Sequence, residues 1–146
     1  MKPSTLLKLF FSAVLLLPVV ADALEMPQDK LGLWELRVQN SSDGGPLTVA
    51  GTMQYCLNAA ALETSRKTAE EKSKNCSKNE VRKEGSKWIQ SSVCKSGGST
   101  VSGQSTTEFN GENAYHLDMN ATYDPPLGGL SRSHTVRDGK WLGPCK

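Results

Sequence analysis

The stretch Phe-Asn-Gly-Glu-Asn-Ala-Tyr-His-Leu-Asp-Met-Asn-Ala-Thr-Tyr, residues 109–123, contains a complete turn-and-strand pattern. The Asn110-Gly111 pair near its start is the strongest short-range signal of a β-hairpin turn. Beyond the turn, apolar and polar residues alternate, so successive side chains point to opposite faces of one strand. The pattern therefore predicts a half-buried antiparallel strand whose apolar face carries Tyr115, Leu117, Met119, Ala121 and Tyr123.

The flanking segments extend this pattern in both directions. Residues 99–109 alternate small polar and apolar residues and predict the partner strand of the hairpin. Residues 124–129, Asp-Pro-Pro-Leu-Gly-Gly, predict a long turn rather than helix or central strand, because proline cannot donate to a strand ladder. A further strand is expected over 131–137, followed by a turn at Asp138-Gly139 and a short segment over 140–142.

The N-terminal half predicts a second hairpin and one helix. Residues 32–39, Gly-Leu-Trp-Glu-Leu-Arg-Val-Gln, alternate between apolar and polar, and 47–56 form the return strand after a run of turn formers. Residues 58–74 have a different character. Asn58 is a suitable N-cap, and Glu/Lys pairs at the i, i+4 spacing support an exposed helix with only a weak apolar stripe.

These segments place the chain in the mainly β class, with α+β character. Hairpin-length connections between about seven short strands predict a curved antiparallel meander or a partly closed barrel, with one helix after the second strand. Only 6% of the residues are aromatic, and small polar residues fill many strand positions. We therefore expect covalent cross-links to supplement a modest hydrophobic core.

The first residues have a composition of their own. Two lysines, Lys2 and Lys8, precede an apolar run at 9–20, and Ala21-Asp22-Ala23 follows. A charged start, a short apolar run and a small-x-small site are typical of a secretory signal peptide. Residues 1–23 are therefore predicted to be removed by cleavage between Ala23 and Leu24.

Cleavage would leave one disulfide-linked, β-rich domain, residues 24–146. The apolar run is too short for the roughly 20 residues that span a bilayer, and no later segment approaches that length. The first cysteine is Cys56, far from the cleavage point, so a lipid anchor is not expected. The formal net charge is +2, and basic and acidic residues are interspersed along the chain. The sequence therefore lacks the concentrated basic face of a nucleic-acid binder.

Residues 81–84 and 87–94 predict a third hairpin, with its turn at Gly85-Ser86. In an antiparallel hairpin centred on this turn, the residue numbers of two facing residues add up to about 170. Arg82 and Trp88 meet this sum and are expected to be partners.

The same sum pairs two of the four cysteines, which in an exported chain allow three disulfide patterns. Cys76 and Cys94 lie opposite one another, which leaves Cys56 to join Cys145. Zinc is the alternative for four thiolates, but the chain has no Cys-x-x-Cys pair of the kind that structural zinc sites use.

His116 and Asp118 share one face of their predicted strand, and His134 follows one strand later. Three such residues could bind a metal or form a hydrolytic triad with a serine. The opposite strand face holds the better core residues, however, so His116 and Asp118 are expected to point to solvent. No nucleophile, zinc, phosphate-binding or calcium-binding motif is present. We therefore expect no catalytic, cofactor-binding or metal-binding residues.

Aromatic residues fall on nearly every predicted strand, and two roles remain open for them. They can fill the core, or some can line the concave side of the sheet and bind an apolar or polymeric ligand. The four expected to face such a ligand are Trp34, Trp88, Tyr115 and Trp141.

Several features occur together: Gly-Leu-Trp-Glu at 32–35, Tyr-Cys-Leu at 55–57 before the helix, the cysteines that bracket the third hairpin, strands rich in Gly, Thr and Ser over 99–120, and Gly-Lys-Trp-Leu-Gly-Pro-Cys at 139–145. In combination they resemble the bacterial domain-of-unknown-function family 3617. The resemblance covers nearly all of the predicted domain. It implies an exported, periplasmic protein of Gram-negative bacteria, and it supplies no catalytic residues.

The expected function is a non-enzymatic binding or accessory module in the periplasm. Its partner is unidentified, and a small apolar ligand and an envelope protein are the candidates. The alternatives are a small periplasmic hydrolase that uses His116 or His134, and an envelope-stress or inhibitor protein that acts through its surface.

Overall fold

The computed structural model describes residues 30–146. They form seven strands and one helix: β1 (Gly32–Ser42), β2 (Thr48–Leu57), α1 (Ala59–Ser73), β3 (Cys76–Glu84), β4 (Lys87–Ser96), β5 (Ser99–Asn110), β6 (Ala114–Leu127) and β7 (Leu130–Gly143). The predicted signal peptide 1–23 and its cleavage point between Ala23 and Leu24 lie outside the described residues. Within the described range, no helix has the length and apolar character needed to cross a membrane.

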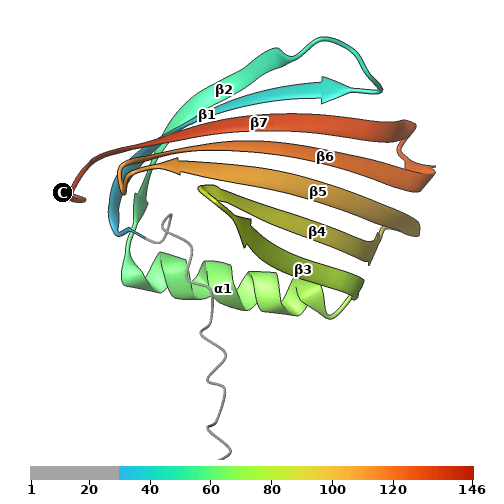
Figure 1. Ribbon diagram of the computed structural model, residues 1–146, viewed down its shortest axis with the longest axis horizontal. Helices are drawn as coiled ribbons and strands as arrows, with labels where there is room; N and C mark the ends of the chain where they lie inside the picture. The colour runs from blue at the N-terminus through green and yellow to red at the C-terminus, as the bar shows by residue number, and fades with distance from the viewer. Residues whose placement is uncertain (1–29) are drawn as a thin grey trace, which may run out of the picture.

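The strands form one antiparallel sheet in the order β2-β1-β7-β6-β5-β4-β3. From β3 to β7 each strand pairs with the next along the chain, as a meander does, and the first hairpin then adds to the far side of β7. Figure 1 shows a curved, open sheet with β2 and β3 at its two edges. The predicted fold class is therefore confirmed, with an open meander in place of a closed barrel.

The helix α1 joins the two edge strands and runs beside β3 (Figure 1). Its N-terminus is capped as predicted, because the Asn58 side chain accepts a hydrogen bond from the backbone N–H of Ala61 at 2.9 Å. None of its residues is buried. The helix therefore connects the sheet edges without forming a second packed layer over the sheet.

Proline does not end β6 where the sequence predicted. The expected turn over 124–129 is wrong, because β6 continues through Pro125 and Pro126 to Leu127 and the chain turns at Gly128-Gly129. The pairing with β7 breaks between Thr122 and Leu127. The prolines lie in this break, where that ladder needs no backbone N–H.

The predicted turn at Asp138-Gly139 is also wrong, because β7 is continuous from Leu130 to Gly143 and includes the segment 140–142. Gly139 has a packing role instead. A Cβ atom built on it would collide with the ring of Tyr115, its cross-strand neighbour on β6. Glycine is thus required inside the strand to leave room for an aromatic ring.

The third hairpin forms as expected, but its register differs by one residue. Arg82 faces Ile89 and Lys83 faces Trp88, so the predicted Arg82–Trp88 pair is wrong. The register then shifts between Cys76 and Lys78, at a bulge that leaves Ser77 without a partner. This shift brings Cys76 opposite Cys94.

Two disulfides link the sheet. Cys76–Cys94 joins β3 to β4 within a sequence separation of 18 residues, and Cys56–Cys145 joins the end of β2 to the chain beyond β7 across 89 residues. Both disulfides join the cysteine pairs predicted from the sequence. The second bond crosses the start of β1, which lies between β2 and β7.

Side chains alternate along each strand, and cross-strand partners point to the same side, so the strand residues divide between two faces of the sheet. We call the face that carries Trp34, Tyr115 and Leu117 the inner face, and the face that carries His116 and Asp118 the outer face. Residues of α1 border the inner face, because one groove is lined both by the end of the helix and by inner-face positions. Within residues 30–146 the buried apolar side chains are few: Trp34, Trp88, Ile89 and Val136.

Candidate ligand-binding face

Aromatic side chains gather at one end of the inner face, where β6 begins and β1 begins beside the end of β7. The rings of Trp34 and Tyr115 have centroids 5.8 Å apart, and Phe109 and Tyr115 are 6.2 Å apart. The tilted planes, at 49° and 52°, are a favourable arrangement for aromatic pairs. This cluster forms because Gly139 lies on β7, the strand between β1 and β6, and its missing side chain leaves the space that the Tyr115 ring occupies.

The four aromatics predicted to face a ligand all lie on the inner face, but at different depths. Trp34 and Trp88 are 2% and 7% exposed, so they form the floor of the face. Tyr115 and Trp141 are half-buried. Trp141 lies at the margin, where its indole N–H donates to the carbonyl oxygen of Leu31 at 3.1 Å and the Lys30 ammonium lies 4.1 Å from its ring centroid.

Three further inner-face residues did not stand out in the sequence. Met53 and Tyr55 of β2 are 54% and 37% exposed, and Arg137 of β7 is exposed between apolar neighbours. Met53 and Tyr55 lie on the same side of β2 because side chains alternate between the two faces of a strand. Nothing in the sequence distinguished Arg137, because its apolar neighbours come from strands β1 and β6.

Tyr55 and Tyr115 meet above the sheet. Their phenol groups are close enough for each to shift the pKa of the other, although β1 and β7 separate their strands. Three strand spacings correspond to about 14 Å in a flat sheet, so both side chains reach across the strands between them. Burial raises the pKa of Tyr115 to about 12, with further raising contributions from Tyr55, and burial likewise raises the pKa of Tyr55. Both phenols are therefore neutral hydrogen-bonding groups at physiological pH.

The other end of the inner face forms a groove with the end of α1. Its volume is about 640 Å³, within the range of small-molecule sites. Its apolar lining comes from the residues Ala69, Val101, Tyr123 and Leu127. The inner face therefore extends from an aromatic end to a mixed groove beneath the helix.

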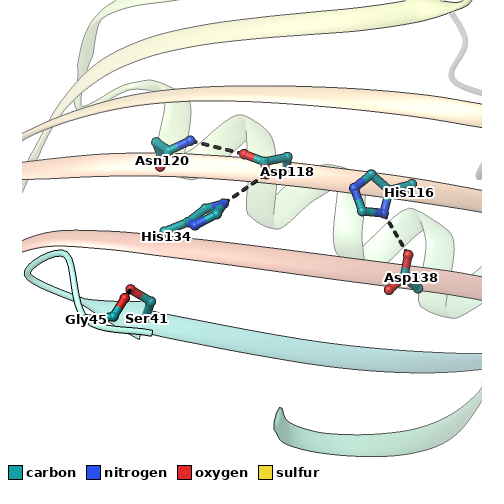
Figure 2. Close-up of polar contacts among 7 residues, drawn as sticks. All are labelled: Ser41, Gly45, His116, Asp118, Asn120, His134 and Asp138. Atoms are coloured by element: carbon teal, nitrogen blue, oxygen red, sulfur yellow. Dashed lines mark hydrogen bonds and ion pairs between the residues drawn. The ribbon is translucent and has the colours of Figure 1, made fainter. Parts of the chain in front are cut away.

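The outer face carries the two histidines, each hydrogen-bonded to a different aspartate (Figure 2). His116 Nδ1 lies 2.7 Å from an Asp138 carboxylate oxygen, and His134 Nε2 lies 2.8 Å from Asp118. Asp118 also accepts a hydrogen bond from the Asn120 amide at 3.1 Å. His116 was predicted to point away from the apolar face. The strand register places it on the outer face, opposite Asp138.

A serine lies near one of these pairs, since Ser41 of β1 faces His134 across the β1–β7 ladder. Figure 2 shows the His134 ring turned toward Asp118 and the Ser41 side chain turned toward Gly45, whose carbonyl accepts from the serine hydroxyl at 2.6 Å. A hydrolytic triad requires a serine–histidine hydrogen bond, and residues 30–146 contain none between Ser41 and His134. No group of three or more potential metal ligands occurs in that range.

Together, the fold and its faces define a small disulfide-linked protein built on one open antiparallel sheet, with an apolar inner face and an ion-paired outer face. Residues 27–145 match the family model described as "Protein of unknown function (DUF3617)", so the chain belongs to this family, as its sequence features indicated. No curated protein and no solved structure matches the chain.

Proposed function

We propose that this protein is an exported, periplasmic, non-enzymatic binding protein, and that its inner face accommodates a small ligand with a substantial apolar part. The single observation that carries this proposal is an apolar sheet face that no second packed layer covers among residues 30–146. A sheet normally buries its apolar face against another element, whereas α1 has no buried residue and Met53 is 54% exposed.

The export part of the proposal has separate support. The N-terminal residues have the composition of a secretory signal, and the two disulfides are consistent with an oxidising compartment outside the cytosol. N-terminal sequencing of the protein from the periplasmic fraction of a Gram-negative host is expected to begin at Leu24. Recovery of the uncleaved chain from the cytosol would contradict export.

The binding part is tested with a neutral fluorescent probe, N-phenyl-1-naphthylamine, whose emission rises in apolar surroundings. Met53→Asp places a charge on the exposed inner face and is expected to weaken probe binding by at least about tenfold. Thr52→Asp is the matched control, because Thr52 is exposed on the outer face of the same strand, opposite Arg37. Equal probe affinity in the parent protein and both variants, or no probe binding by the parent, would remove the proposal.

Native mass spectrometry of protein purified from the periplasm complements the probe. A co-purifying small molecule supports the proposal. A stoichiometric partner protein held by the inner face would instead support the envelope-stress or inhibitor alternative and would count against a small-ligand role.

A hydrolase remains the second candidate, favoured by one observation: His134 lies between Asp118, to which it is hydrogen-bonded, and the facing Ser41. A periplasmic hydrolase of this design would lose activity on His134→Ala. We expect p-nitrophenyl esters to be hydrolysed at the background rate by the parent and by the His116→Ala/His134→Ala variant alike. Hydrolysis by the parent that the double substitution abolishes would establish the enzymatic alternative.

A further inference from the structure

We propose that the inner face selects amphiphiles with a carboxylate head group, and that Arg137 pairs with this carboxylate beside the hydroxyls of Tyr55 and Tyr115. The inference deepens the proposed function and rests on it. The predicted ligand class is a fatty acid, whose hydrocarbon chain lies along the apolar inner face.

The first argument is the distribution of charge between the two faces. Every acidic residue of the seven strands lies on the outer face: Glu35, Glu80, Glu84, Glu108, Asp118, Asp124 and Asp138. The inner-face positions of the strands hold two cations and no acid. Lys83 lies 5.4 Å from the ring centroid of Trp88, and the second cation is Arg137. The inner face is therefore complementary to an anion.

The second argument is the environment of Arg137. Its cross-strand neighbours are Val38 on β1 and Leu117 on β6, both apolar. Its side chain is exposed, and no ion pair joins it to a carboxylate among residues 30–146. A guanidinium among apolar side chains offers several donors in a planar fork that matches a carboxylate. Its apolar surroundings fit the hydrocarbon chain that a fatty acid carries.

The third argument is the tyrosine pair. Arg137 is near enough to the phenols to favour their ionised forms, which opposes the effect of burial on each pKa. Because burial dominates, both phenols keep their protons, and a protonated phenol can donate a hydrogen bond to a carboxylate. One cation and a phenol donor together make charge-assisted hydrogen bonds to a carboxylate, which are stronger than neutral ones.

The test uses dibrominated stearate and its uncharged methyl ester, because bromine atoms quench tryptophan fluorescence at short range. The chain has three tryptophans, and all lie on the inner face, so quenching reports its occupancy. We expect the parent to bind the acid at least about tenfold more tightly than the ester. Arg137→Met is expected to remove this preference by weakening acid binding alone. Tyr55→Phe/Tyr115→Phe is expected to reduce it in part.

Arg37→Met is the matched control. Arg37 is one residue from Val38, the cross-strand neighbour of Arg137, and is likewise exposed, but it lies on the outer face opposite Asp138. It is expected to leave both affinities unchanged. Arg137→Lys keeps the charge and is expected to keep part of the preference, with circular dichroism confirming that each variant is folded.

The outcomes separate the two proposals. Quenching of the parent by acid and ester at equal concentrations would overturn carboxylate selection and leave apolar binding intact. A preference for the acid that Arg37→Met removes as fully as Arg137→Met would also overturn the assignment to the inner face. No quenching by either compound would overturn the proposed function together with this inference.

Discussion

Gly139 is a strand residue whose lack of a side chain sets the shape of the inner face. The Tyr115 ring occupies the position that a Cβ atom would take. Gly139→Ala is therefore expected to destabilise the protein by about 1–3 kcal/mol, because the ring must leave its position against Trp34. Urea denaturation followed by tryptophan fluorescence measures the change.

Gly51→Ala provides the matched control for this substitution. Gly51 also lies within a strand, and a Cβ atom built there meets nothing within 4 Å. Alanine should be neutral or slightly stabilising at this position, since it reduces the freedom of the unfolded chain. Equal free energies of unfolding for both variants would show that the Tyr115 ring does not depend on Gly139.

Tyr115 also makes the stability sensitive to alkaline pH. Its pKa is raised from 10.0 to about 12 in the folded protein, chiefly by burial. A phenol that keeps its proton more tightly when folded contributes stability that is fully present below pH 10 and is lost as the pH rises toward 12. The free energy of unfolding should therefore fall over this window more steeply for the parent than for Tyr115→Phe. Parallel pH profiles would contradict the assignment.

The hairpin of β3 and β4 depends on its bulge and its disulfide together. The bulge at Ser77 brings Cys76 opposite Cys94, and the bond closes a loop with a sequence separation of 18. In the chain-entropy model such a loop contributes about 3 kcal/mol. Cys76→Ser/Cys94→Ser is expected to lower the free energy of unfolding by up to this amount.

The longer disulfide gives the comparison for this prediction. Cys56–Cys145 spans 89 residues, and the same model assigns it about 4.5 kcal/mol. Its removal should therefore cost more than removal of Cys76–Cys94, as measured by urea denaturation of each double-serine variant. The reverse order would mean that unfolded-state entropy does not govern these bonds.

The strands β1 and β6 were predictable as elements because one face of each is more apolar than the other. This alternation located the hairpins and assigned Tyr115 and His116 to opposite faces. The missed boundaries have a common cause. Pro125 and Gly139 are turn formers by local preference, but one lies in a break of the ladder and the other beneath a ring from a neighbouring strand. Both circumstances are tertiary and leave no local trace.

At the scale of the whole molecule, strand order limits what a sequence alone can tell about the site. Because β1 pairs with β7, Tyr55 and Tyr115 meet across two intervening strands, and Arg137 comes to lie between Val38 and Leu117. No spacing in the sequence encodes this arrangement. The segregation of all strand acids to the outer face likewise becomes visible only when all registers are known.

The Cys56–Cys145 bond has a consequence for what happens when a protease cuts the chain. The helix α1 has no buried residue and is therefore open to proteases, and it lies inside the loop that this bond closes. A peptide bond hydrolysed within α1 therefore leaves two fragments that stay covalently joined, with every strand of the sheet still tethered to its neighbours. Such nicked molecules should migrate as one species in electrophoresis until a reductant separates the pieces.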